Sequence, residues 1–280
     1  MLDTHVAELN GENGGAELPG PSQRRPGVPA VLNAISILHH LQDNGNRPLT
    51  MTEFSRELGL NGSTCFNLLR TLADHRLLSY DPDTRRYSLG LALVELAAIV
   101  DNHGKLVEIA QAHADRVAHD LGQVCLIFRK ATDGSFLVVG KAEGTANLRV
   151  TANVGDRFPA NGAVLAKAHY AWCSEEQVSR MLARDGLPAR SNRSITNYTD
   201  FKRELTKVRA RGYSTSLSEY LPGHNAVGAA VVTPDGTPSL LLVVTGFAAL
   251  IPPEKMPFVG ARLVQAVGAI AREVYGRPRQ

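Results

Sequence analysis

The sequence is poor in the residues that build disulfide or metal frameworks. Its 280 residues include only three cysteines, Cys65, Cys125 and Cys173, which lie far apart and form no CxxC pair. Sparse cysteines of this kind are typical of a reducing compartment. No combination of His, Cys, Asp and Glu has the spacing of metal ligands. We therefore expect no metal site and no cofactor.

Long apolar runs and a large excess of one sign of charge are also missing. No run approaches the roughly 20 apolar residues that cross a bilayer, and the N-terminal MLDTHVAELNGENGG lacks the order of a signal peptide. These absences predict a cytoplasmic protein with no membrane partner. The formal net charge is only +3, which permits a nucleic acid as partner but does not demand one.

Signatures of catalysis are absent as well. The sequence contains no G-x-S-x-G, no P-loop, no H-E-x-x-H and no G-x-G-x-x-G that opens a helix after a strand. The adjacent pair Glu175 and Glu176 is a poor acid–base dyad, because neighbouring residues on a helix do not face each other. We expect no catalytic residues and no enzyme. An enzyme with a fused regulatory domain and a winged-helix protein-interaction module remain the alternatives.

The most informative segment that is present covers residues 48–90. Thr50 and Glu53 have the spacing of a helix capping box. Gly59 follows where that helix would end, and a second amphipathic helix begins near Asn61. Strand-like residues then flank the turn sequence DPD. Two helices joined by a tight turn and followed by a hairpin predict a winged helix-turn-helix, whose second helix enters the major groove of DNA.

The periodicity of the second helix separates a buried face from a DNA-binding face. Cys65, Leu68, Leu69 and Leu72 form the apolar stripe. The opposite side carries short polar groups and an arginine, which suit phosphates and base edges. Two further arginines lie at the tip of the hairpin. The candidate DNA-binding residues are Ser63, Thr64, Phe66, Asn67, Arg70, Arg85 and Arg86.

The chain divides by composition into four parts. Residues 1–27, rich in Gly, Pro, Glu and Asn, predict a disordered arm, and residues 28–89 the winged helix-turn-helix. Residues 90–104 predict an apolar linker helix, buried either against a second copy or within one chain. Residues 105–280 alternate between helices and strands, with strands expected at 123–130, 135–143, 148–154, 214–220, 226–233 and 239–246. This pattern predicts an α+β protein whose second domain is a GAF/PAS-like α/β domain.

Four segments together resemble the IclR family of bacterial transcription regulators. They are LGLNGSTCFNLLRTLADHRLL, the wing ending RRYSLG, VGDRFPANGAVLAKA, and RGYSTSLSEYLPGHNAVGAAVVTPDG. The resemblance covers about residues 28–277. It implies an effector-binding second domain, and homodimers or homotetramers that bind palindromic operators in double-stranded DNA. Repressors and activators both occur in the family, so the direction of regulation stays open.

The resemblance also implies the positions of an effector pocket. These positions are Asn161, Gly162, Ala163, Ser216, Ala226, Val243 and Thr245. The helix expected to start at residues 161–164 offers free N–H groups and a partial positive charge, which suit a carboxylate. Apolar neighbours such as Ala226 and Val243 suit a larger body beside it. We therefore expect a medium-sized organic acid, with an aromatic acid as one option.

Overall fold

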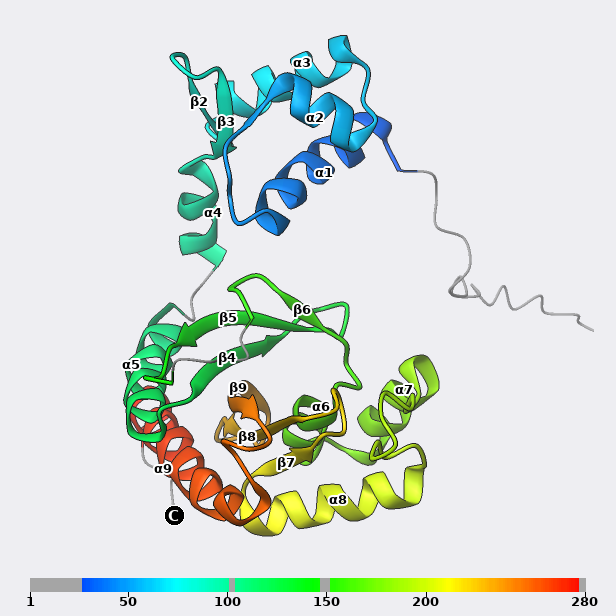
Figure 1. Ribbon diagram of the computed structural model, residues 1–280, viewed down its shortest axis with the longest axis vertical. Coiled ribbons are helices and arrows are strands. Elements are labelled where there is room, and N and C mark those ends of the chain that lie inside the picture. The colour runs from blue at the N-terminus through cyan, green and yellow to red at the C-terminus, as the bar shows by residue number, and fades with distance from the viewer. Residues whose placement is uncertain (1–26, 101–103, 147–151, 277–280) are drawn as a thin grey trace, which may run out of the picture. The chain divides into compact units, whose positions relative to one another are not determined.

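The computed structural model describes residues 27–100, 104–146 and 152–276 (Figure 1). The chain divides into two compact units, one up to Leu93 and one from Val94 onward. This division falls inside the helix predicted as a linker. The predicted arm, apart from residue 27, and residues 101–103 of the predicted linker lie outside the described residues.

The described part of the first unit contains three complete helices and a small three-stranded sheet. The helices are α1 (Pro29–Asp43), α2 (Met51–Leu58) and α3 (Gly62–Asp74). The strands β1 (Leu49–Thr50), β2 (Leu78–Asp81) and β3 (Arg86–Leu89) pair antiparallel in the order β1-β3-β2. The predicted winged helix-turn-helix is thereby confirmed, with β2 and β3 as the wing. The helix α4 (Ala92–Val100) follows the wing.

Local interactions fix the turn between α2 and α3. The Thr50 side chain accepts from the backbone of Glu53, and the Glu53 carboxylate accepts from the backbone of Thr50, so the predicted capping box is present. Gly59 ends α2 with φ of 65°, a left-handed conformation that a side chain would strain. The Asn61 side chain then accepts from the Thr64 N–H and starts α3. These contacts fix where α2 ends and where α3 begins, and so determine the turn between the two helices.

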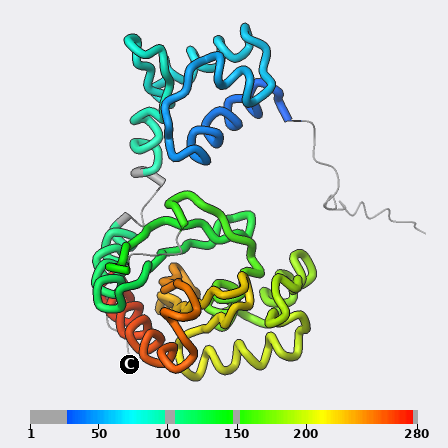
Figure 2. Tube along the Cα trace, viewed as in Figure 1, coloured from blue at the N-terminus to red at the C-terminus, as the bar shows by residue number. Residues whose placement is uncertain are grey.

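The second unit is built on one antiparallel six-stranded sheet in the order β6-β5-β4-β9-β8-β7. Figure 2 shows the chain passing from one half of this sheet through helices and back into the other half. The strands are β4 (Val124–Lys130), β5 (Phe136–Ala142), β6 (Arg157–Phe158), β7 (Ser214–Leu217), β8 (His224–Val232) and β9 (Pro238–Phe247). The helices are α5 (Gly104–Leu121), α6 (Ala163–Tyr170), α7 (Glu175–Asp185), α8 (Tyr198–Arg211) and α9 (Met256–Tyr275), the last preceded by a short 3₁₀ turn at Pro253–Lys255.

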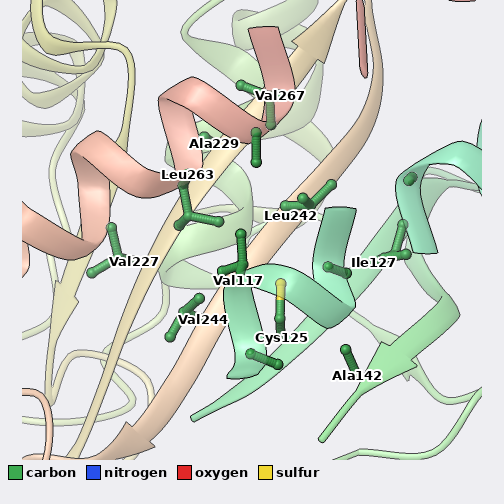
Figure 3. Packing of buried hydrophobic residues seen from close by; sticks show 14 of the residues in the cluster. Val117, Cys125, Ile127, Ala142, Val227, Ala229, Leu242, Val244, Leu263 and Val267 are labelled. Carbon is green, nitrogen blue, oxygen red and sulfur yellow. The ribbon is translucent and has the colours of Figure 1, made fainter. Parts of the chain in front are cut away.

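Both faces of this sheet are covered, as the alternation of side chains along the strands requires. On β9, Leu242 and Val244 pack with α5 and α9, whereas Leu241 and Val243 belong to the cluster on the α6 side. Figure 3 shows the first cluster, in which Leu263 and Val267 of α9 lie against Ala229 and Leu242 of the sheet. The central strands β4, β8 and β9 read as largely apolar runs because most of their positions are buried on both faces.

Two strand predictions differ from the structure. Residues 148–151 of the strand expected at 148–154 lie outside the described residues, and 152–154 form no strand. The strand expected at 214–220 ends at Leu217, because Ser218 adopts a left-handed φ of 57° that turns the chain out of the sheet. The two-residue strand β6 has no prediction at its position, since it is too short to show an alternating pattern.

Two negative findings hold for the part of the chain that the structure describes. None of its helices combines the length and hydropathy needed to span a membrane. Its His, Cys, Asp and Glu side chains form no group of three that could hold a metal ion.

Burial of His169 makes the stability of the second unit depend on pH. The ring lies against Phe136 and Tyr170, and desolvation lowers its pKa to about 3. The unfolded chain therefore binds a proton below pH 6.5 that the folded chain does not. Stability from this group is complete above pH 6.5 and falls as the pH decreases toward 3. Between pH 6.5 and 5, we expect His169→Phe to remove about 1–2 kcal/mol of the decline in unfolding free energy.

Urea unfolding followed by the fluorescence of Trp172, the single tryptophan of the chain, measures this decline. The exposed His119, changed to Phe, is the control for the loss of a histidine at the surface. Equal pH slopes for the wild type and His169→Phe would contradict the assignment.

Candidate DNA-binding and effector-binding sites

The outer face of α3 carries most of the predicted DNA-binding side chains. Ser63, Asn67 and Arg70 are exposed, and Phe66 keeps 46% of its surface exposed although it is aromatic. Thr64 is half-buried, and its backbone N–H is occupied by the Asn61 cap. On the opposite side Cys65, Leu69 and Leu72 are buried and Leu68 is half-buried. The helix is therefore held by its apolar stripe and presents a polar face with one arginine to solvent.

The two wing arginines have different environments. Arg86 donates to the Pro48 carbonyl at 2.8 Å, and its guanidinium lies 3.2 Å from the Glu53 carboxylate. The hydrogen bonds from Thr50 and the nearby Arg86 charge lower the pKa of Glu53. Arg86 thus joins the wing to the start of α2. Arg85 is exposed at the turn with φ of 53°, and is the better placed of the two for a contact with DNA.

A cavity of about 170 Å³ lies between the sheet and the start of α6. Six of the seven predicted effector positions line it, namely Gly162, Ala163, Ser216, Ala226, Val243 and Thr245. The structure thus brings together positions that span more than 80 residues of sequence.

The register of the sheet explains why these positions meet. Ser216 of β7 is paired with Ala226 of β8, and Ala226 is paired with Thr245 of β9. Two residues along β8, Gly228 is paired with Val243. Residues two apart on a strand face the same side, so both rows point toward α6. Small side chains in these rows leave the space that forms the cavity.

The start of α6 supplies the polar end of the cavity. Its N-cap is Gly162, which has no side chain to cap the helix, and both Gly162 and Ala163 line the cavity. The first N–H groups of a helix lack partners within the helix, and the helix dipole adds a partial positive charge there. An anion in this cavity can accept hydrogen bonds from these groups.

The side chains around the cavity carry little charge. Its lining includes no lysine or arginine among the described residues. His224 is half-buried, and desolvation lowers its pKa, so the ring is neutral at pH 7. Its Nε2 lies 3.4 Å from the Thr245 hydroxyl. Hydroxyls of Ser216 and Thr245 with a neutral imidazole provide hydrogen bonds without a fixed cation.

Asn161 is the one predicted effector residue that does not line this cavity. Its amide donates to the carbonyls of Asp185 and Gly186 at 2.8 and 3.3 Å, and its Oδ1 accepts from Arg190 at 3.3 Å. The side chain therefore connects the start of α6 to the segment after α7. It occupies the other side of the α6 N-terminus.

Sequence reasoning missed the aromatic and outer walls of the cavity. Phe128, Phe158 and Tyr220 line it, with ring centroids 5.4 Å apart for the first pair and 6.3 Å apart for Phe158 and Tyr220. His224 and the 54% exposed Leu221 complete the side toward solvent. Alternation along β4 could have placed Phe128 on the cavity face. Nothing in the sequence shows that residues 220–224 fold back over the helix start.

Comparison with known proteins gives matches over both units. Residues 30–82 match the model of the IclR helix-turn-helix domain, and residues 98–274 match that of the bacterial transcriptional regulator IclR C-terminal domain. The acetate operon repressor of Salmonella typhimurium is 23% identical over 256 residues, covering 90% of this chain and 92% of that protein. The transcriptional repressor IclR of Escherichia coli is 23% identical and covers 90% and 95%.

Two solved structures are similar to this chain over most of its length. An IclR transcriptional regulator from Alicyclobacillus acidocaldarius is 31% identical with a TM-score of 0.72, covering 88% of this chain and 98% of that one. The Thermotoga maritima IclR, 22% identical with a TM-score of 0.73 over the same shares, has the same fold. With both family models matched in order, the chain belongs to the IclR family of transcriptional regulators.

Proposed function

We propose that this regulator binds palindromic operator DNA as a homodimer or homotetramer in the cytoplasm, and that a small organic acid in the α6 cavity changes its affinity for DNA. The observation that carries the proposal is the cavity itself, because six predicted effector positions surround one uncapped helix start. The protein would act by binding rather than by catalysis.

The exposed face of α3 supports the DNA part of the proposal. Arg70 has 69% of its side chain exposed, and its nearest carboxylate oxygen, on Asp74, is 3.8 Å away. This distance is too long for a hydrogen bond, so the guanidinium can turn toward a base edge or a phosphate. Asn67 and Ser63 lie on the same exposed side. Binding by a helix of this kind in the major groove is the ordinary mode of a helix-turn-helix.

An exposed apolar stripe on α1 supports self-association. Val28, Val31, Leu32 and Ile35 have 43–64% of their surface exposed, and their spacing places them on one side of a helix. Covering such a stripe with a second copy removes it from water. A two-fold dimer would present two copies of α3 to successive turns of a palindromic site.

The size and polarity of the cavity support an organic acid. A protein cavity of about 150 Å³ admits benzene, so about 170 Å³ holds an aromatic ring or a branched alkyl chain of similar size. The carboxylate would accept hydrogen bonds from the start of α6, and Phe128, Ala226 and Val243 would contact the apolar body. Coupling to DNA requires that the acid binds one arrangement of the protein better than another, typically by about 1–3 kcal/mol.

Arg70→Ala should weaken binding to a DNA fragment from upstream of the gene by about 1–3 kcal/mol, because the loss of a bidentate base contact costs this much. Fluorescence anisotropy measures the affinity. Arg56→Ala is the matched control, since Arg56 is equally exposed on α2 and pairs with Glu57. If the fragment binds no better than unrelated DNA, the domain serves as a protein-interaction module instead.

Substitution of the two wing arginines should have different effects on the salt dependence of DNA binding. Arg85→Ala should reduce the slope of log K against log salt by about 1, the value for one lost phosphate contact. Arg86→Ala should leave this slope nearly unchanged and lower the thermal stability of the first unit, because its ties to Pro48 and Glu53 are lost. The reverse result would show that Arg86 is the residue that contacts DNA.

Calorimetric titration with benzoate and with its neutral analogue benzamide tests the effector. Benzoate should bind, and benzamide should bind at least about tenfold more weakly, since it lacks the charge that a helix N-terminus favours. Ala226→Leu should abolish benzoate binding by filling the cavity. Ala249→Leu, at an exposed position outside the cavity, is the control. Benzamide binding as tightly as benzoate would contradict recognition of an anion.

A further inference from the structure

The outer wall of the cavity is formed by the segment that follows β7. Ser216 and Ala226 are buried, whereas Tyr220 is half-buried and Leu221 is exposed. The Tyr220 ring also approaches Phe158 on the opposite wall, with centroids 6.3 Å apart. The two rings thus meet across the cavity, on the side where Leu221 is exposed to solvent.

The base of this wall is firmly anchored. Lys167 of α6 is 98% buried, and its ammonium donates to both oxygens of the Glu219 carboxylate at 2.7 and 2.8 Å. The Glu219 carbonyl accepts from the hydroxyls of Ser191 and Ser194 at 3.2 and 2.7 Å. Breaking a buried ion pair on one side is costly, so Glu219 holds its place.

Arg190 bridges Tyr220 of this wall to the start of α6. Its guanidinium lies over the Tyr220 ring, 4.7 Å from the centroid, and also donates to Asn161 Oδ1 at 3.3 Å. Asn161 immediately precedes Gly162 and Ala163, which line the cavity. One exposed side chain thus connects both sides of the cavity mouth through a cation–π contact and a hydrogen bond, each of modest strength.

We propose that Arg190 is a positioning residue that holds Tyr220 across the mouth of the effector cavity and controls the entry and exit of the ligand. The strength of the contacts fits this role. They are strong enough to keep the mouth closed most of the time and weak enough to open thermally. Opening moves Arg190 away from Tyr220 while the Lys167–Glu219 pair stays in place. The role as an effector gate rests on the proposed function, whereas the closure itself can be measured without any effector.

Thiol accessibility inside the cavity measures the closure. The background variant carries Ser216→Cys as the buried reporter and Cys173→Ala to remove the partly exposed native thiol; Cys65 and Cys125 are buried. The probe is methyl methanethiosulfonate, a small uncharged reagent, and modification is followed by mass spectrometry. In this background, Arg190→Ala should raise the rate at residue 216 by roughly five- to tenfold, as the loss of two weak contacts implies.

Two comparisons distinguish a gate from a general loosening. Arg193→Ala, which removes an exposed arginine of the same segment, should leave the rate and the thermal unfolding midpoint unchanged. Tyr220→Ala should raise the rate as Arg190→Ala does, and the two together should add little, because Arg190 acts through the ring. Tyr220→Phe should retain the slow rate, since it keeps the ring on which the guanidinium stacks.

The proposal is overturned if residue 216 reacts no faster in Arg190→Ala than in Arg193→Ala. It is also overturned if the rate increase of the double variant equals the product of the increases caused by Tyr220→Ala and Arg190→Ala alone. Failure of the benzoate titration alone would remove the proposed effector class and leave these rates interpretable. A faster modification rate accompanied by a lower thermal unfolding midpoint would also reject the gate, because the faster rate would then reflect loss of structure.

Discussion

The second unit depends on one constraint, namely that its central strands are buried on both faces. Every second side chain of β4, β8 and β9 must pack against α5 and α9, so only the alternate positions are free to shape a site. On that side Gly228 sits where an added Cβ would lie 3.1 Å from Val164 and 3.3 Å from Val243. Small residues here let α6 approach closely at one row and leave a cavity at the next. The site is thus a by-product of how closely a helix and a sheet can pack.

Charge is distributed around the cavity rather than in it. The cations of its surroundings, Lys167 and Arg190, are directed to Glu219, Asn161 and Tyr220. The polar groups that face the interior are a helix start, two hydroxyls and an imidazole, set among apolar and aromatic side chains. The polar end of the cavity and one support of its wall come from the same short element, α6, whose start lines the cavity and whose Lys167 binds Glu219.

The sequence predicted the architecture well where periodicity or capping residues determine it. Thr50, Glu53 and Gly59 specify the helix-turn-helix locally, and the runs of β8 and β9 specify buried strands. The seven effector positions came from family resemblance, and six of them share one cavity. The position of Asn161 outside the cavity, the contacts of Arg86 and the wall at Tyr220 all depend on contacts between residues more than 20 positions apart. Such contacts leave no periodic trace in a sequence.

The absence of lysine and arginine from the described lining of the cavity has a consequence for how the two units respond to their surroundings. Attraction between an anion and a helix start inside the fold is shielded only weakly by dissolved ions, because the ions cannot enter. Contacts between exposed arginines and a polyphosphate backbone release counterions and weaken steeply as salt rises. Under the proposed function, a rise in intracellular salt would therefore weaken binding to the operator and leave binding of the organic acid largely unchanged.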